Sequence, residues 1–167
     1  MMIIGIDPGI TGAIAVLPDR RQPWRWSVYD IPTRLADNQS RSERIVDARR
    51  LYQIFRAIKI AAGSRPIRVY LERIHAMKDA AIVAFSMGQT NGTILSILSL
   101  LDLDPVRVEP QNWKRFHGLL KSDKDASRQF VLRNFPSSAS AMARKKDHNR
   151  AESLLIALYG SEIESRS

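Results

Sequence analysis

The stretch MIIGIDPGITGAIAVL, residues 2–17, decides the fold. It holds an apolar run over residues 2–6, a Pro-Gly turn, and a second apolar run over residues 12–17. Short apolar runs bounded by turn residues predict two β-strands, and strands joined by so few residues pair antiparallel. The first run ends at Asp7. A carboxylate is therefore expected at the carboxyl end of a buried strand.

The rest of the chain predicts one further strand and then alternating helices and strands. A third strand is expected over residues 24–31, and residues 34–42 are polar and aperiodic, as in a loop. Apolar spacing and Gly or Pro breaks then predict a helix over residues 43–62, a strand over 66–71, a helix over 79–101, a strand over 105–109, and helices over 123–134 and about 147–159. This order predicts an α/β fold: a five-stranded mixed sheet, three antiparallel strands then two parallel ones, with helices on both faces.

Length and composition favour a single domain over residues 1–167, with a core over 1–160 and a C-terminal tail over 161–167. The sequence has no cysteine, which excludes disulfides and thiolate metal sites. The N-terminus lacks the basic region of a signal peptide, and the most apolar stretch, residues 80–101, is interrupted by two amide side chains, which argues against a membrane span. A cytoplasmic protein of a bacterium or phage is therefore expected, with an organellar origin as the alternative.

Positive charge is concentrated in one segment of the chain. The formal net charge is +9. Residues 111–150 hold ten Lys and Arg against three Asp, a net +7, whereas the other 127 residues together carry +2. Such a segment is either a solvated charged face or a surface that binds a polyanion through its phosphates.

Three acidic residues stand where burial makes a charge costly. Asp7 and Glu72 each end an apolar strand, and Glu152 lies in the apolar run AESLLIALYG. Acids at the carboxyl ends of neighbouring strands can meet, and converging carboxylates repel unless a cation lies between them. Carboxylate oxygens suit Mg²⁺ or Mn²⁺, so the three acids predict a metal site, and with the basic segment they predict phosphodiester chemistry. The simpler alternatives are a turn cap at Asp7 and a surface ion pair between Glu72 and Arg73.

Five stretches resemble, in order, the motifs of RuvC-type Holliday-junction resolvases, especially the phage and chloroplast branch. They are GIDPGITGAIAV, VYLER, SMGQTNGTI, VEPQNWKRFHGLLKSDK and DHNRAESLLIALYG. The resemblance implies a ribonuclease-H-like fold and a homodimeric endodeoxyribonuclease that nicks two opposing strands of a four-way DNA junction. It also implies two Mg²⁺ ions per site, which Mn²⁺ can replace, and no nucleotide cofactor.

The resemblance carries the family's catalytic, metal-binding roles onto the three acids above. Its phosphate-binding lysines correspond to Lys114 and to Lys124, although the loop before Lys124 is one residue shorter than in the bacterial enzymes. The helix with Gly88 and Gly92 corresponds to the dimer region of the family. Close packing of that helix on the sheet through the same small residues is the alternative, and the two are compatible.

The segment KKDHNRAES, residues 145–153, supplies a fourth candidate for the metal site. His148 and Glu152 are four residues apart and share a helix face, so they are expected to act together. The imidazole of His148 is expected to bind one metal ion or to take a proton from the attacking water. Asp147 is better placed as an N-cap, or as a support that orients His148.

Several side chains are expected to contact DNA. Bacterial members of the family place an aromatic ring shortly after the acid of the fourth strand, and here the flat side chain nearby is His75. It is expected to stack on an unpaired base, as a weaker platform than Phe, or else to be a polar residue at the start of a loop. The basic side chains expected at phosphates are Lys114, Lys121, Lys124, Lys145, Lys146 and Arg150.

Three other functions fit parts of the sequence. A nuclease of the same fold could act on flaps or other branched DNA, and a non-catalytic junction-binding protein could keep the fold and the basic face. The hairpin DPGITG, residues 7–12, also loosely fits the phosphate-binding hairpin of actin-like and sugar-kinase ATPases. Those enzymes need two such domains in one chain, and 167 residues provide one.

Overall fold

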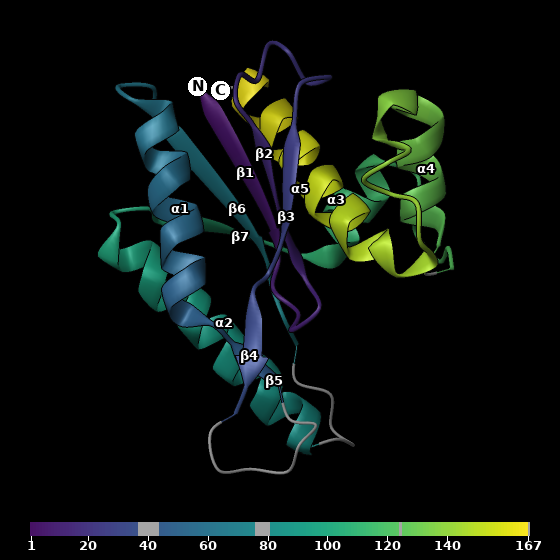
Figure 1. The fold of residues 1–167 in the computed structure, drawn as a ribbon. Coiled ribbons are helices and arrows are strands. Elements are labelled where there is room, and N and C mark those ends of the chain that lie inside the picture. Colours follow the sequence, from purple (N-terminus) through teal and green to yellow (C-terminus); the bar gives the residue numbers. More distant parts are fainter. Residues whose placement is uncertain (37–43, 76–80, 124, 167) are drawn as a thin grey trace.

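A computed structural model describes residues 1–36, 44–75, 81–123 and 125–166, and shows a mixed sheet between two layers of helices (Figure 1). The strands of this sheet are β1 (Met2–Asp7), β2 (Ala13–Leu17), β3 (Ser27–Asp30), β6 (Ile67–Glu72) and β7 (Pro105–Val108). Their order is β3-β2-β1-β6-β7. The first three strands pair antiparallel and the last two join in parallel. The predicted five-stranded mixed sheet is confirmed.

Helices cover both faces of the sheet, as predicted (Figure 1). One face carries α1 (Ala48–Ala62) and α2 (Ala81–Leu100), and the other carries α5 (His148–Arg166), with α3 (Pro110–Phe116) and α4 (Ala126–Asn134) beside it. Two 3₁₀ turns, Pro136–Ser138 and Lys145–Asp147, lead into α5. Because side chains alternate along a strand, even-numbered residues of β1 pack under α1 and α2 and odd-numbered residues face α5.

The sequence analysis missed a short hairpin before α1. β4 (Thr33–Leu35) and β5 (Arg44–Val46) pair antiparallel as a separate two-stranded sheet, where a loop and the first turn of a helix were expected. Part of the expected loop, residues 37–43, lies outside the described residues. The helix begins at Ala48 because the Asp47 carboxylate accepts the backbone N–H of Arg50 at 3.0 Å and so caps it.

Two other boundaries differ from the prediction. The short helix α3 was not predicted, since seven residues are too few to show a helical period. The last helix runs on to Arg166, through most of the residues expected as a tail. There the hydroxyl of Tyr70 donates to Glu164 at 2.8 Å, which ties this last part of α5 to β6.

Two glycines allow α5 to lie close against the sheet. A Cβ on Gly5 would stand 2.3 Å from the carbonyl oxygen of Ser153 and 2.4 Å from the amide nitrogen of Ala157. A Cβ on Gly160 would stand 2.3 Å from the ring of Tyr70. Any larger residue at either position would therefore push the helix away from the central strands.

Helix α2 leaves a large apolar surface uncovered. Ile82, Phe85 and Leu100 are 86%, 73% and 77% exposed. A Cβ on Gly88 or Gly92 would meet no atom within 4 Å, so within the described residues these glycines do not pack on the sheet. By length and composition α2 could cross a membrane, and only 22% of the tested window is buried. An apolar helix face of this kind calls for a partner.

Candidate active site

The geometry of the sheet brings two of the predicted acids together. Residues two apart on a strand point to the same face of the sheet. Asp7 lies two residues after Gly5, and Glu72 two residues after Tyr70, and both Gly5 and Tyr70 face α5. Both acids therefore point to the face that α5 covers. Ile6 pairs with Leu71 across the parallel strands β1 and β6, which places Asp7 and Glu72 side by side at their carboxyl ends. Glu152 approaches from the second turn of α5.

Asp7 is the most deeply buried of the three acids, at 9% exposure. Burial, together with the neighbouring carboxylates of Glu72 and Glu152, raises its pKa to about 8. The backbone N–H of Gly9 donates to Oδ1 at a long 3.4 Å, so the turn supports the carboxylate only weakly. The alternative role of Asp7 as a turn cap therefore explains little of its position.

Glu72 is held in place by an indole. The Nε1–H of Trp113, a fully buried residue of α3, donates to Oε1 of Glu72 at 2.9 Å. Burial raises the pKa of Glu72, and the hydrogen bond from Trp113 opposes that rise because it stabilises the ionised form. The pairing of Glu72 with Arg73 is not what the structure shows, since Arg73 pairs with Glu109 at 3.0 Å.

Glu152 has two polar neighbours. The hydroxyl of Ser127, in α4, donates to Oε1 at 3.3 Å, and Nζ of Lys114 lies 3.9 Å from the same oxygen. The Lys114 ammonium also lies 5.1 Å from the ring centre of Trp113. It acts favourably on the ionised forms of Asp7 and Glu72 as well. Lys114 is therefore the positive charge of this acidic site, and one of the two lysines singled out in the sequence.

The donor set suits a divalent cation. The charge of Glu152 raises the pKa of both Asp7 and Glu72, so the site needs more positive charge than one partly exposed lysine supplies. Within residues 1–36, 44–75, 81–123 and 125–166, no group of three or more His, Asp or Glu is close enough to hold a metal ion as it stands. To bind a metal ion, the carboxylates would have to move closer together. The positive charge of the ion would offset their mutual repulsion.

His148 stands at the first turn of α5, one turn before Glu152. Its Nδ1 lies 3.2 Å from the carbonyl oxygen of Lys145. This contact orients the ring through Nδ1 and assigns Nε2 as the nitrogen available for a metal ion or a proton. The structure does not bring His148 into a preformed group with the acids, so its place in the site stays a prediction.

Asp147 is structural, but not in the way the sequence predicted. It is 3% exposed, and its carboxylate accepts the backbone N–H of Arg144 at 2.7 Å and the Arg144 guanidinium at 2.7 and 3.0 Å. Burial opposes ionisation, but these bonds outweigh it and lower the pKa of Asp147. The carboxylate therefore closes the 3₁₀ turn that precedes α5, and the predicted cap of the α5 amides is wrong.

The expected DNA contacts fall into two groups. Lys121, Lys145 and Lys146 are exposed, as phosphate contacts require, and Lys124 lies outside the described residues. Arg150, in contrast, donates to both oxygens of Asp30 at 2.6 Å and to the carbonyl of Ala141 at 3.0 Å. Its guanidinium ties α5 to β3, which gives it a structural role.

His75 is exposed but not free to turn. Its Nε2 lies 2.7 Å from Oε2 of Glu109, the residue that also pairs with Arg73. The ring is thus fixed at the carboxyl end of β6, on the same edge of the sheet as Glu72. A fixed, exposed ring at this place is compatible with the predicted stacking role.

Three supporting contacts were not predicted. Trp113 and Ser127 hold two of the acids, and Asn149 donates to the carbonyl and hydroxyl oxygens of Thr11 at 2.7 and 2.9 Å. All three join segments distant in the sequence, so no local spacing points to them. A Trp beside the lysine expected to bind a phosphate was the one available signal, since the indole N–H of a buried Trp needs an acceptor.

Comparison with known proteins shows similarity to a Holliday junction resolvase in sequence and to RuvC in structure. No family model matches the sequence. The chain is 30% identical over 152 residues to a chloroplastic Holliday junction resolvase of Chlamydomonas reinhardtii, MOC1, across 81% of this chain and 17% of that protein. The chain thus spans about a sixth of the length of the curated relative that it matches.

The structural similarity covers the whole chain. Thermus thermophilus RuvC in complex with a Holliday junction substrate matches with a TM-score of 0.58 and 17% identity, over 100% of this chain and 97% of RuvC. A second structure of T. thermophilus RuvC matches with a TM-score of 0.53 and 16% identity, over 99% and 97% of the two chains. The chain has the fold of RuvC, and the expected ribonuclease-H-like fold is confirmed.

Metal-free unfolding should reveal the buried carboxyl of Asp7. In the folded state its pKa is about 8, against an ordinary 3.8, so its contribution to stability is complete below about pH 4 and is lost as the pH rises through about 8. The free energy of unfolding, measured with urea in EDTA, should fall from about pH 5 to about pH 8.5 by at least about 1 kcal/mol more in the wild type than in Asp7→Asn. An equal slope in the two proteins would contradict the raised pKa.

Removal of the indole N–H should make Glu72 harder to ionise. In Trp113→Phe the ring is kept but the bond that stabilises the ionised carboxylate is lost, so the pKa of Glu72 should rise further. Carbon-detected NMR titration of the side-chain carboxyls measures it directly, with Trp26→Phe as the control. A pKa of Glu72 that is the same in both variants would show that the indole does not support this carboxylate.

Proposed function

We propose that this chain is a RuvC-type resolvase, a structure-specific endodeoxyribonuclease that nicks two opposing strands of a four-way DNA junction. The observation that carries the proposal is the set of carboxylates around Lys114, with Asp7 buried and Glu72 and Glu152 half-buried, at the carboxyl ends of the strands of a sheet with the RuvC fold. The similarity to a Holliday junction resolvase over most of this chain supports it.

The three acids and His148 would hold two Mg²⁺ or Mn²⁺ ions. Asp7 would contribute to both ions, Glu72 to one, and Glu152 with His148 to the other. Bound ions would supply the positive charge that makes a water nucleophilic and stabilises the leaving oxygen. Trp113 and Ser127 keep two of the carboxylates oriented. Nε2 of His148 would either hold the second ion with Glu152 or, as the alternative, take the proton from the attacking water.

Lysines would hold the DNA next to this site. Lys114 lies among the acids and would contact the phosphate nearest to them. The exposed Lys121, Lys145 and Lys146 would contact the neighbouring backbone, together with Lys124. Binding through phosphates weakens steeply as the salt concentration rises, and selectivity would come from the shape of the junction.

A homodimer would place two active sites on opposing strands. The apolar surface of α2, with Ile82, Phe85 and Leu100 exposed, is the surface proposed for the contact. Gly88 and Gly92 leave open space on it, which would let a second helix approach closely. A dimer contact on this surface would also account for the apolar composition of α2, which resembles that of a membrane-spanning helix.

The proposed location is the cytoplasm of a bacterium or of a phage-infected cell, where a four-way DNA junction would be the substrate. The relative from Chlamydomonas reinhardtii is chloroplastic, which makes an organelle the alternative.

The direct test compares three synthetic substrates. A mobile four-way junction, a flap and a linear duplex are incubated with the protein, with Mg²⁺ and with EDTA. Asp7→Asn should lower the rate of junction nicking at least about 100-fold and leave junction binding in EDTA unchanged. Paired symmetric nicks in the junction alone identify a resolvase, and nicks in the flap identify another branched-DNA nuclease. Binding with no metal-dependent cleavage of any substrate would identify a non-catalytic binding protein.

The two neighbours at the start of α5 should behave differently. His148→Ala should lower the nicking rate at least about 100-fold because it removes the group that would hold the second ion or accept the proton, with little effect on stability. Asp147→Ala should lower the free energy of unfolding by about 1–3 kcal/mol, because it leaves the Arg144 bonds unmade, and largely keep the nicking rate. Single-turnover kinetics and urea unfolding measure the two quantities. The opposite pattern would place Asp147 in the active site.

One charge on α2 should separate the dimer. Phe85→Glu puts a carboxylate in the centre of the proposed contact, so sedimentation should change from twice the chain mass of 18.9 kDa to a single chain. Ile60→Glu, on the exposed side of α1, is the matched control and should leave the dimer intact. A wild-type protein that sediments as a monomer, free and on the junction, would contradict the proposed dimer.

A further inference from the structure

Among the described residues, the outer edge of β3 has backbone groups without a hydrogen-bond partner. The N–H of Ile31 donates to the carbonyl of Gly12, which sets the alternation of hydrogen bonds between β2 and β3. In this alternation the backbone N–H and C=O of Tyr29 point toward β2, whereas those of Val28 and Asp30 point away from β2. β3 is the last strand on its side of the sheet. It is therefore an open template for one more strand.

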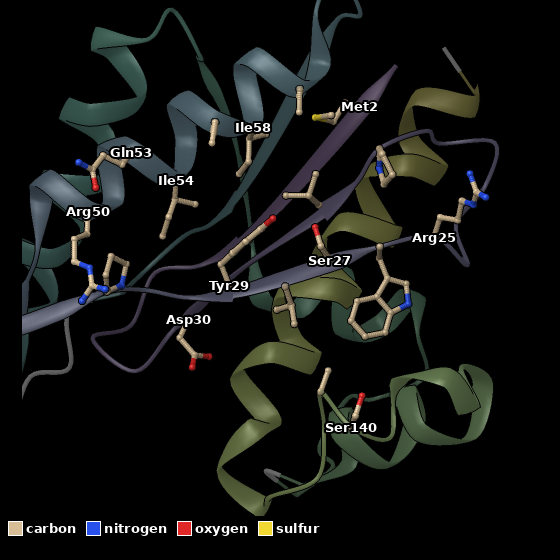
Figure 2. Close-up of a pocket in the computed structure, with 18 of the residues that line it drawn as sticks. Met2, Arg25, Ser27, Tyr29, Asp30, Arg50, Gln53, Ile54, Ile58 and Ser140 are labelled. Atoms are coloured by element: carbon tan, nitrogen blue, oxygen red, sulfur yellow. The ribbon is translucent and has the colours of Figure 1, made fainter.

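This edge forms the floor of a groove of about 1300 Å³. One wall is α1, and the other is the segment that follows the first 3₁₀ turn (Figure 2). Figure 2 shows Ile54 and Ile58 on the α1 side of β3 and Ser140 on the opposite side. The two walls differ in chemistry: the α1 wall is mainly apolar, and the opposite wall offers Ser137, Ser140 and Ala141.

Two guanidinium groups line the groove without an ion-pair partner in the described part of the chain. They belong to Arg25, just before β3, and to Arg50, in the first turn of α1. The one acid of the lining, Asp30, is already neutralised by Arg150 at 2.6 Å. Arg25 and Arg50 lie toward opposite ends of the groove in Figure 2. The groove therefore favours an occupant with a negative charge near each end.

We propose that this groove binds an extended peptide segment of a partner protein, which adds to the sheet as a strand beside β3. The backbone of the segment bonds to Val28 and Asp30. Its alternate side chains are apolar where they face Ile54 and Ile58, and small or hydroxylated where they face Ser140. Carboxylates near its two ends pair with the arginines. The proposal stands independently of the nuclease function.

A nucleic acid strand fits the groove less well. Trp24 is 62% and Tyr29 41% exposed, so rings for base stacking exist. A single strand, however, carries one phosphate charge for each nucleotide, about 3.4 Å of rise in a duplex strand, whereas the lining has two free cations. The apolar side chains of α1 would lie against those phosphates. The free backbone edge of β3 would also find no complementary ladder in DNA.

The test uses a defined probe, the blocked peptide acetyl-EVSVSVE-amide. It alternates valine with serine and ends in glutamates, and its binding is followed by calorimetry and by the fluorescence of Trp24 and Trp26 in the groove. Saturable binding is expected. The same composition in the order EVVVSSE, and the alternating peptide with its edge-facing amides N-methylated, should each bind at least about tenfold more weakly, because alternation or backbone bonding is lost.

Changes in the protein give the matched controls. Val28→Pro removes an N–H that points away from β2, so it should weaken binding of the probe at least about tenfold. Val28→Thr keeps this N–H and should leave the affinity for the probe unchanged. Ile54→Glu, on the α1 wall, should also weaken binding of the probe, without changing β3. Thermal unfolding followed by circular dichroism checks that each variant folds, and N-methylated probes test the same bonds in the unaltered protein.

Three results would overturn the proposal. The first is no saturable binding of the alternating peptide, or equal binding of the N-methylated one. The second is tight binding of an oligothymidylate that competes for the groove and depends on Trp24, which would make it a nucleic-acid site. The third is a change of the sedimenting mass of the free protein on Val28→Pro, which would show that β3 of a second copy fills the groove.

Discussion

The close approach of α5 to the middle of the sheet is the constraint on which the active site depends. It is possible because Gly5 and Gly160 have no side chains where the helix and the sheet meet. Both acids of the strands point to this face, and Glu152 comes down to them from the helix. A partly exposed ion pair between Arg150 and Asp30 secures the same contact near the start of α5, and a hydrogen bond from Tyr70 to Glu164 secures it near the end. A helix held even slightly farther away would separate the carboxylates.

That approach creates an electrostatic conflict, which the surrounding residues reduce only in part. Asp7 is buried beside two other carboxylates, so its pKa rises to about 8. Trp113 and Lys114, adjacent in α3, each favour ionisation of Glu72, one by a hydrogen bond and one by its charge. A short helix that sequence patterns did not show thus provides the chief counterweight to the repulsion. The remaining excess of negative charge would favour a cation at this site.

Different parts of the molecule are available for different partners. The carboxyl ends of β1 and β6 carry two of the acids, α2 has an uncovered apolar face, and the lateral edge of the sheet at β3 has the groove. Because these surfaces lie on separate elements, DNA, a second copy and a peptide would not compete for one place. The rigid sheet connects all three.

Sequence alone determined the order of the main strands and helices, the mixed sheet, and the identities of the three acids, because each depends on local spacing of apolar residues and on a carboxylate that interrupts it. It missed the β4–β5 hairpin and α3, which are too short for a period to show. It assigned Asp147 the wrong hydrogen-bond partners and expected Arg150 at a DNA phosphate, because Arg144 and Asp30 become their partners only in three dimensions. Tertiary structure also decided that Trp113 supports Glu72, since the two residues lie on different elements and no pattern along the chain relates them. Which charges are buried, and what they face, is set by packing between distant segments.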